Sequence, residues 1–430
     1  SNAGEMGTNL IIVVNDNEMS IAENHGGLYQ NLKELRDTEG RSSCNFFRSL
    51  GLDYLYVGEG NDIPSLIAAF AKVKDTSRPT VVHIHTQKGK GYAPAEADRE
   101  EFHWEMPFDL ETGKPKVDCS GMEDYHSLTG KFLLEKMKED HTVVAISSGT
   151  PTVIGFTPER RKQAGRQFVD VGIAEEHAVA LASGIAAGGG RPVYGVYSTF
   201  IQRCYDQLSQ DLCINGNPAV ITVFMGTVAG MNDVTHLGFF DIPLISNIPN
   251  MVYLAPTCSE EYFAMLEWAV RQTEYPVAIR VPGAAVVHRK EEFDTDYSEL
   301  NRYKMTARGE TVAILALGAF YDLGQALKNK LREESGVEAT LINPRYITGL
   351  DEPMLEELKV GHRIVVTLED GVLDGGFGEK IARYYGNSEM RVLNYGLRKE
   401  FADRYNLDEL MKANRLTDKQ MAEDIAGILE

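Results

Sequence analysis

The chain has 430 residues, of which 43% are hydrophobic and 25% are charged, as is usual for a water-soluble globular protein. This length is too great for a single hydrophobic core and predicts two or three domains. A formal net charge of −20 argues against general binding to nucleic acids or anionic membranes, although a local basic pocket for phosphate stays open.

The cysteines predict a reducing compartment. There are five, an odd number, and none forms a CxxC pair. This pattern favours free thiols in a cytoplasmic protein over a disulfide framework or a zinc site. No apolar run approaches the length of a membrane span, and the first residues do not resemble a signal peptide. The five are Cys44, Cys119, Cys204, Cys213 and Cys258.

Residues 1–118 are predicted to form the latter half of an α/β domain. The continuous apolar run Leu10–Val14 is typical of a parallel strand buried on both faces. Oxygen-bearing side chains follow directly, in 15–21. Side chains just past a strand's carboxyl end lie where open α/β sheets bind ligands. An Asx turn that caps the next helix accounts for the same residues equally well.

Two further elements and a basic turn complete this segment. Apolar spacing predicts a helix over Leu66–Val73, and Thr80–His85 reads as the next buried strand. The glycine-rich turn 86–96 then contains Lys88, although glycines mark ordinary loops as well. His103 lies shortly after, and a lone histidine is more often structural than catalytic.

Residues 109–123 read as a linker because they contain Gly113, Pro115 and Gly121. A second domain follows at 119–290. Its predicted elements are a helix at Tyr125–Glu139 and strands at Thr142–Ser147, Gln167–Val171, Pro192–Tyr197 and Ala219–Val223.

The stretch 170–190 is the most informative in the chain. Glu175, Glu176 and His177 stand at a turn and lead into a helix made largely of alanine, serine and glycine. Carboxylates suit the first turn of a helix, whose free N–H groups carry partial positive charge. The small residues predict that another backbone approaches closely, and the simplest alternative is a packing helix with a solvated acidic start. These small residues are Ala178, Ala182 and Gly184.

The run Ile173–Ala178 resembles the cofactor-activating segment of the transketolase-like, thiamine-diphosphate-dependent enzymes. The surrounding chain is most similar to the 1-deoxy-D-xylulose-5-phosphate synthase family, and 15–24 and 198–207 carry the same resemblance. The resemblance implies three α/β units with parallel sheets. They are a truncated cofactor domain at 1–118, a pyrimidine-binding domain at 119–290 and a transketolase C-terminal domain at 300–430.

The resemblance implies that Glu175 contacts N1′ of the cofactor's aminopyrimidine. A carboxyl beside Ile173, Ala174 and a close-packed helix is poorly hydrated, so it can share a proton with a ring nitrogen. The imino tautomer that results can remove the thiazolium C2 proton, and the carbanion chemistry then belongs to the cofactor. Phe200 is implied to stack on the aminopyrimidine ring.

The resemblance also implies a magnesium site in the turn after the first strand. Asn17 would supply a side-chain oxygen and Met19 a main-chain carbonyl, which are hard ligands of the kind Mg²⁺ prefers. Lys88 is the candidate for an anion contact with the cofactor, and His103 aligns loosely with an active-site histidine. The family's Gly-Asp-Gly motif, with its metal-binding aspartate, is expected upstream of Ser1.

At the substrate end, the resemblance implies roles for Tyr197, Arg203 and His236. Arg203 could hold an anionic oxygen, and His236 could donate a proton or bind a hydroxyl. The alternative readings are a core phenylalanine at Phe200 and an ordinary surface arginine at Arg203.

The chain departs from the family pattern at three positions. Met225 stands where the family has arginine, Asn232 where it has aspartate, and no second arginine follows Pro282. In the family the two arginines bind the phosphate of glyceraldehyde 3-phosphate, and loss of charged, forked donors weakens binding. The acceptor substrate therefore stays open.

In the last segment, predicted strands alternate with helices, which indicates a parallel sheet covered by helices. The glycine cluster in 368–378 resembles a nucleotide loop but lacks its basic residue. Glu369 and Asp370 are predicted to cap this glycine turn. The strands are expected at Val312–Leu317, Glu338–Ile342 and Arg363–Thr367.

The function implied is a transferase that decarboxylates pyruvate on thiamine diphosphate and joins the two-carbon unit to glyceraldehyde 3-phosphate. Such a product feeds isoprenoid, thiamine and pyridoxal biosynthesis. Three alternatives stay open: a transketolase-like enzyme with another aldehyde acceptor, one half of a two-chain enzyme, and a non-catalytic binding protein with the same fold. We expect Mg²⁺, small-molecule substrates and a homodimer, with neither nucleic acid nor membrane as a partner.

Overall fold

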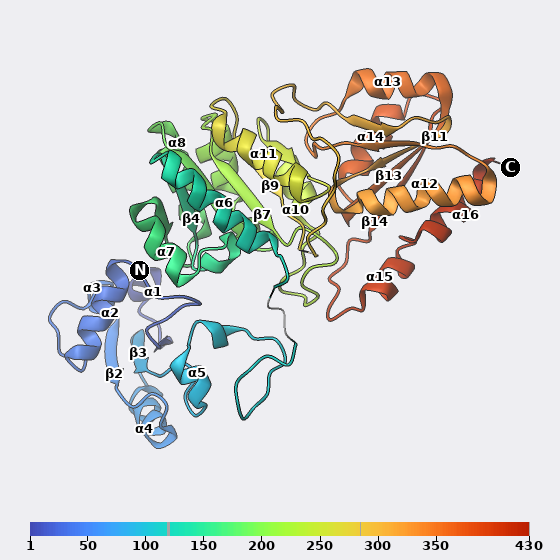
Figure 1. Ribbon diagram of the computed structural model, residues 1–430. Coiled ribbons are helices and arrows are strands. Elements are labelled where there is room, and N and C mark those ends of the chain that lie inside the picture. The colour runs from blue at the N-terminus through green and yellow to red at the C-terminus, as the bar shows by residue number, and fades with distance from the viewer. Residues whose placement is uncertain (118–120, 284, 430) are drawn as a thin grey trace. The chain divides into compact units, whose positions relative to one another are not determined.

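The computed structural model describes residues 1–117, 121–283 and 285–429 (Figure 1). The chain divides into two compact units. The first is Ser1–Met122 with Asp170–Ile173, and the second is Glu123–Val169 with Ala174–Glu430. None of the helices in the described ranges combines the length and apolar character that a bilayer crossing requires. Cys119 lies outside the described residues, and the other four cysteines are free.

The first unit contains a three-stranded parallel sheet in the order β1-β3-β2. Both predicted elements at 66–73 and 80–85 are confirmed, as α4 and β3. Asp62 starts α4 by accepting a hydrogen bond from the Ser65 N–H at 2.8 Å. The elements are α1 (Asn2–Met6), β1 (Ile11–Asp16), α2 (Gly27–Asp37), α3 (Phe46–Ser49), β2 (Asp53–Val57), α4 (Ile63–Val73), β3 (Thr80–His85), α5 (Ala93–Ala97) and the 3₁₀ turn η1 (Glu101–His103).

The prediction for the first strand was right about its parallel pairing and wrong about its burial. β1 pairs with β3 from Ile11 opposite Thr80 onward. The side chain of Val13 is nevertheless 47% exposed, because β1 is an edge strand and β3 occupies the centre of the sheet. An apolar run alone does not distinguish an edge strand from a central one.

A buried polar network lies at the end of β1. Asp16 is 5% exposed, pairs with Arg36 of α2 and lies 3.0 Å from His83 Nε2. The Tyr54 hydroxyl contacts the other ring nitrogen of His83 at 2.6 Å. Burial alone would raise the pKa of Asp16, but the hydrogen bonds with His83 and Arg36 outweigh it and lower the pKa from 3.8 to about 2. The network therefore holds an ionised carboxylate against the turn that follows β1.

The second unit begins with a six-stranded sheet in the order β5-β4-β6-β7-β9-β8. Asp124 caps α6 through the Ser127 N–H at 2.7 Å, so the predicted helix Tyr125–Glu139 is confirmed to the residue. The elements are α6, β4 (Val143–Ser147), α7 (Pro158–Ala164), β5 (Phe168–Asp170), α8 (Glu175–Ala187), β6 (Arg191–Tyr197), α9 (Tyr205–Gln207), β7 (Val220–Phe224), α10 (Asp241–Ser246), β8 (Val252–Leu254), α11 (Ser259–Arg271) and β9 (Val277–Arg280), with the short turns η2 (Pro151–Ile154), η3 (Gly165–Gln167), η4 (Ile201–Cys204) and the π-helical η5 (Leu208–Cys213).

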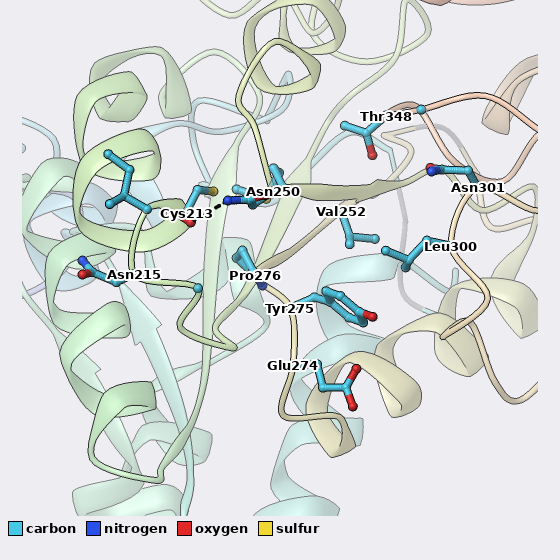
Figure 2. A pocket seen from close by; sticks show the side chains of 14 residues that line it. Cys213, Asn215, Asn250, Val252, Glu274, Tyr275, Pro276, Leu300, Asn301 and Thr348 are labelled. Atoms are coloured by element: carbon cyan, nitrogen blue, oxygen red, sulfur yellow. Dashed lines mark hydrogen bonds between the residues drawn. The ribbon is translucent and has the colours of Figure 1, made fainter.

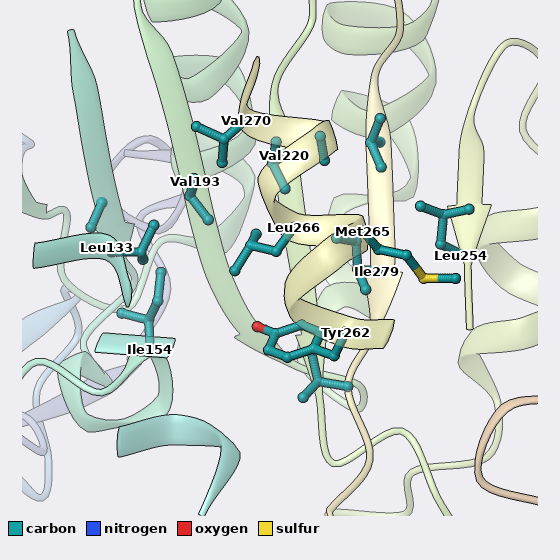
Figure 3. Packing of buried hydrophobic residues seen from close by; sticks show 14 of the residues in the cluster. Leu133, Ile154, Val193, Val220, Leu254, Tyr262, Met265, Leu266, Val270 and Ile279 are labelled. Atoms are coloured by element: carbon teal, nitrogen blue, oxygen red, sulfur yellow. The ribbon is translucent and has the colours of Figure 1, made fainter. Parts of the chain in front are cut away.

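The core of this sheet is built from complementary apolar faces. Figure 3 shows Tyr262 and Leu266 of α11 packed toward Val193 of β6 and Val220 of β7. All four side chains are almost completely buried. The parallel strands carry β-branched residues on both faces, as expected of a sheet covered by helices on each side.

A five-stranded sheet follows in the order β10-β12-β11-β13-β14. The predicted parallel arrangement is confirmed except at β10, which runs antiparallel to β12. α12 and α16 lie side by side (Figure 1). The elements are β10 (Lys304–Ala307), β11 (Thr311–Ala316), η6 (Gly318–Phe320), α12 (Tyr321–Ser335), β12 (Thr340–Asn343), α13 (Glu352–Gly361), β13 (His362–Val372), α14 (Phe377–Tyr385), β14 (Arg391–Leu397), α15 (Leu407–Ala413) and α16 (Asp418–Leu429).

A buried ion cluster joins the two sheets of the second unit. Arg280, at the end of β9, donates from Nε to Asp241 at 2.7 Å and also pairs with Asp370 on β13. Its NH2 group donates to the Gly238 carbonyl at 3.0 Å. Burial raises the pKa of Asp370, and the charge of Arg280 opposes this rise. The cluster thus connects β9, α10 and β13 through one cation.

The prediction that Glu369 and Asp370 both cap the glycine turn is half right. Glu369 does so, because its two oxygens accept from the Phe377 and Gly378 N–H groups, each at 2.8 Å. Asp370 instead pairs with Arg280. Successive side chains of a strand point to opposite faces, so these two neighbours cannot share one turn.

Replacing Arg280 by methionine should destabilise the second unit strongly. The change would leave Asp241 and Asp370 buried without their cation, which typically costs about 3–5 kcal/mol. Urea unfolding of wild type and variant would measure the loss. The matched control is Arg308→Met, which removes an exposed pair with Glu357 and should cost less than about 1 kcal/mol. Equal small losses in both variants would contradict the prediction.

Asp16 should stabilise the first unit in a pH-dependent way. Its pKa is about 2 in the fold against 3.8 ordinarily, so the stabilisation is fully present above pH 3.8 and is lost as the pH falls toward 2. The shift corresponds to roughly 2 kcal/mol. The destabilisation caused by Asp16→Asn should therefore be larger at pH 5 than at pH 3. Pulsed hydrogen exchange in urea, read on peptides of residues 1–117, would test this, and a pH-independent penalty would disprove it.

Candidate functional site

Glu175 is the first residue of α8 and its side chain is 3% exposed. Ala178 and Ala182 on the same helix are completely buried, as the prediction of close packing requires. The prediction was wrong for Gly184, which is exposed and where an added Cβ atom would meet no neighbouring atom within 4 Å. Residues four apart share a helix face, whereas Gly184 stands only two residues beyond Ala182 and faces away.

Arg203 lies against the buried carboxylate. Its NH1 group donates to Glu175 Oε2 at 3.1 Å. The Arg203 side chain is 57% exposed, and a guanidinium carries five N–H donors. Arg203 can therefore hold Glu175 and still offer donors to a second anion. The salt bridge with Glu175 is a contact that the sequence did not predict.

The structure brings three of the predicted site residues together through their rings. Tyr197 ends β6, and its ring centroid lies 5.6 Å from that of Phe200 in an edge-on arrangement. The Phe200 ring lies 5.4 Å from that of His236. His126, which sequence reasoning missed, stacks on Phe224 at 4.8 Å and lies edge-on to Tyr197 at 6.2 Å. Tyr197 and Phe224 are the last residues of β6 and β7, and Phe200 and His236 follow these strands. They therefore lie at the carboxyl ends of the strands, where parallel sheets place their ligand sites. His126 comes instead from α6.

His236 has an orienting carboxylate that the sequence did not reveal. Its Nδ1 atom lies 3.1 Å from Asp233 Oδ1 and 2.8 Å from the Thr235 hydroxyl. The hydrogen bond from Thr235, together with that from His236, lowers the pKa of Asp233. Asn232, at the position where the family has aspartate, instead donates to the Tyr405 carbonyl at 3.0 Å. The carboxylate beside His236 in this chain is thus that of Asp233.

The two positions without the family's arginines lie next to each other. A Cβ atom at Gly283 would come within 2.5 Å of the Met225 sulfur. Met225 also adopts a positive φ of 58°. Neither position carries charge, and Arg280 nearby in sequence is occupied by Asp241 and Asp370. This corner of the site is therefore apolar.

In the first unit, Asn17 and Met19 lie in the turn after β1. The Asn17 side-chain oxygen accepts from the Met19 N–H at 3.1 Å, which is the Asx turn given above as the alternative interpretation. However, α2 begins only at Gly27, so this turn caps no helix. No cluster of three or more histidine, cysteine or acidic side chains suited to a metal occurs among the described residues.

The turn nevertheless fits part of a magnesium site. The Asn17 carbonyl oxygen keeps a second lone pair, and the Met19 carbonyl is a second hard donor. Mg²⁺ requires octahedral coordination and commonly takes its remaining ligands from water and phosphate. Two protein oxygens from one turn, with water and phosphate as the other ligands, are consistent with this kind of coordination.

Lys88 binds main-chain carbonyls just after the same turn. Its ammonium donates to the Ser20 and Ile21 carbonyls at 2.9 and 3.3 Å, and burial lowers its pKa. Partial burial and then the nearby charge of Lys88 lower the pKa of His103, which favours a neutral imidazole. The structure therefore places Lys88 and His103 in one neighbourhood, with Lys88 bound to main-chain oxygens.

A separate pocket of about 470 Å³ lies at the amino ends of the strands of the six-stranded sheet (Figure 2). It is lined by residues just before β7, β8 and β9, among them Cys213, Asn250 and Tyr275. Glu175 and His236 follow the other ends of the strands. This pocket is therefore distinct from the group around Glu175.

Three family models match the chain. The transketolase pyrimidine-binding domain matches residues 123–286, and the transketolase C-terminal domain matches residues 302–421. A model described as 1-deoxy-D-xylulose-5-phosphate synthase matches residues 1–45.

Solved structures share the fold. A transketolase from Pichia stipitis aligns over 99% of this chain and 73% of its own, with 14% identity and a TM-score of 0.59. A split-gene transketolase aligns over 70% of this chain and 96% of its own, with 20% identity and the same TM-score of 0.59. At these identities the likeness concerns the fold alone.

Curated relatives are closer. The 1-deoxy-D-xylulose-5-phosphate synthase of Lachnoclostridium phytofermentans is 32% identical over 97% of this chain and 73% of its own length. That of Clostridium tetani is 32% identical over 100% of this chain and 74% of its own. The chain belongs to the 1-deoxy-D-xylulose-5-phosphate synthase family of transketolase-like, thiamine-diphosphate-dependent enzymes.

Proposed function

We propose that the protein decarboxylates pyruvate on thiamine diphosphate and transfers the two-carbon unit to glyceraldehyde 3-phosphate. The observation that carries this proposal is the buried Glu175 carboxylate at the start of α8, 3.1 Å from Arg203. Family membership supports the same reaction. The product would serve isoprenoid, thiamine and pyridoxal biosynthesis.

Glu175 would act on the cofactor by sharing a proton with N1′ of the aminopyrimidine. A carboxyl that is 3% exposed is largely shielded from bulk water and can be placed within hydrogen-bond reach of a bound ring nitrogen. Phe200 would lie against the aminopyrimidine face by offset stacking. When bound, thiamine diphosphate supplies the carbon nucleophile and the electron sink.

The substrate would meet Tyr197, Arg203 and His236. Because Nδ1 of His236 lies 3.1 Å from Asp233 Oδ1, its Nε2 atom is left to give or take a proton at the substrate. The exposed guanidinium of Arg203 would bind the pyruvate carboxylate or the acceptor's phosphate. Asp233 would keep the imidazole oriented.

Asn17 and Met19 would hold Mg²⁺ through oxygen atoms, together with the cofactor's diphosphate. Lys88 would contact an anionic group of the cofactor, and neutral His103 would accept or donate a proton near the substrate. We also propose domain limits of 1–118, 119–290 and 300–430, a cytoplasmic location and a homodimer. The family models at 123–286 and 302–421 support the second and third limits.

Glu175→Gln should abolish most activity. The amide keeps the shape of the side chain but cannot carry the proton, and general acid–base groups typically contribute about 100- to 10,000-fold. Pyruvate decarboxylation by the full-length protein, and deuterium exchange at the cofactor's C2 position, would both measure the loss. The matched control is Glu176→Gln, an exposed glutamate in the same helical turn, which should retain activity.

Equal activity of wild type and Glu175→Gln would contradict this assignment. Full-length protein that never binds thiamine diphosphate with Mg²⁺ would instead favour a binding protein that kept the fold. If activity requires a second polypeptide, the chain is one half of a two-chain enzyme.

A second candidate is a transketolase-like enzyme with another acceptor, which the apolar corner at Met225 and Gly283 favours. Pyruvate consumption should be compared with glyceraldehyde 3-phosphate and with unphosphorylated glyceraldehyde. Our first proposal requires stimulation by the phosphorylated aldehyde, and the absence of stimulation would favour the second candidate.

Met225→Arg should strengthen use of the phosphorylated acceptor roughly tenfold, because one charge-assisted hydrogen bond is worth about 1.5–3 kcal/mol. The unphosphorylated acceptor is the control, since its KM should not change.

A further inference from the structure

The loop that carries His236 has little structure of its own. It connects β7 to α10 across residues 225–240 and contains neither helix nor strand. Its internal main-chain hydrogen bonds are short-range, for example His236 N–H to the Asp233 carbonyl at 3.0 Å. A connection of this length needs partners elsewhere for its main-chain groups.

Several of those partners come from three consecutive residues that follow β14, and another is the Thr199 hydroxyl, which donates to the Thr235 carbonyl at 3.0 Å. The Tyr405 hydroxyl donates to the Val228 carbonyl at 2.7 Å and, more weakly, to the Met231 carbonyl at 3.3 Å. The Arg404 N–H donates to the Asn232 carbonyl at 2.6 Å. Asp403 accepts from the Val234 N–H at 3.1 Å. The 403–405 segment thus binds the loop at four positions from 228 to 234, directly before His236.

The contacts run in both directions. The Asn232 side chain donates back to the Tyr405 carbonyl at 3.0 Å. Burial raises the pKa of Tyr405 to about 12, so its hydroxyl remains a donor at neutral pH. At the far end of the loop, Arg280 donates to the Gly238 carbonyl at 3.0 Å. His236 is therefore flanked by two anchors, both connected to the C-terminal sheet.

We propose that Tyr405 is a positioning residue that sets the place of His236 by holding the 228–234 part of the loop. This inference rests on the proposed role of His236 at the substrate. Asp233, which orients the imidazole, lies between two of the anchored residues, Asn232 and Val234. Releasing this part of the loop would therefore loosen the carboxylate and the imidazole together, although the Thr199 hydroxyl still binds the Thr235 carbonyl.

The test compares Tyr405→Phe with Tyr395→Phe in the full-length protein. Both remove one hydroxyl from the C-terminal part, but that of Tyr395 contacts Asp424 at 3.1 Å and not the loop. We expect Tyr405→Phe to lower kcat/KM roughly 10- to 100-fold, as misplacement of a catalytic group by an ångström can. Tyr395→Phe should keep wild-type activity. Equal losses in both variants would overturn the proposal.

A double-mutant cycle separates positioning from a general structural effect. If Tyr405 acts through His236, Tyr405→Phe should cost little further activity in a His236→Ala background. Losses that multiply independently would overturn the proposal.

Hydrogen exchange gives a readout that does not need activity. Peptides covering 226–237 should exchange at least several-fold faster in Tyr405→Phe than in wild type or Tyr395→Phe. Unchanged exchange would refute the loop-holding role even if the thiamine chemistry is confirmed. Faster exchange in a protein without that chemistry would support the loop-holding role while rejecting the proposed function.

Discussion

One buried cation connects the parts of the second unit on which the site depends. Arg280 is 3% exposed and lies between Asp241 and Asp370, which are completely buried. Such a cluster is tolerated because one guanidinium donates hydrogen bonds to both carboxylates and to the Gly238 carbonyl. Through it, β9 of the six-stranded sheet, the start of α10 and the carboxyl-terminal end of β13 are held together, and so is the end of the His236 loop.

The candidate site also pairs carboxylates with nitrogen groups, but its pairs are more exposed to solvent than the Arg280 cluster. Glu175 is buried at the start of a helix, whereas its partner Arg203 is exposed to solvent. Arg203 can therefore bind a second anion in addition to Glu175. His236 and Asp233 are both partly exposed, which leaves the imidazole accessible to a substrate. In each pair the carboxylate orients a nitrogen base or cation. The ring of Phe200 then lies between the Tyr197 and His236 rings.

The C-terminal part of the chain also helps to hold the loop that carries His236. Asp370 of β13 reaches the loop between β7 and α10 through Arg280, and Tyr405, in the segment after β14, reaches it directly. The apolar corner at Met225 and Gly283 lies in the same region of the chain and bears on the choice of acceptor.

The sequence by itself determined the α/β class, most of the strands, the helices at Leu66–Val73 and Tyr125–Glu139, and the segment that carries Glu175. Local signals suffice for these, such as the Asp124 cap of the helix Tyr125–Glu139. Only the tertiary structure decided the edge position of β1, the pairing of Asp370 with Arg280, and the contacts of Asp233 and Tyr405. Each depends on partners distant in sequence or on which face of a strand meets them, and no periodic pattern records that information.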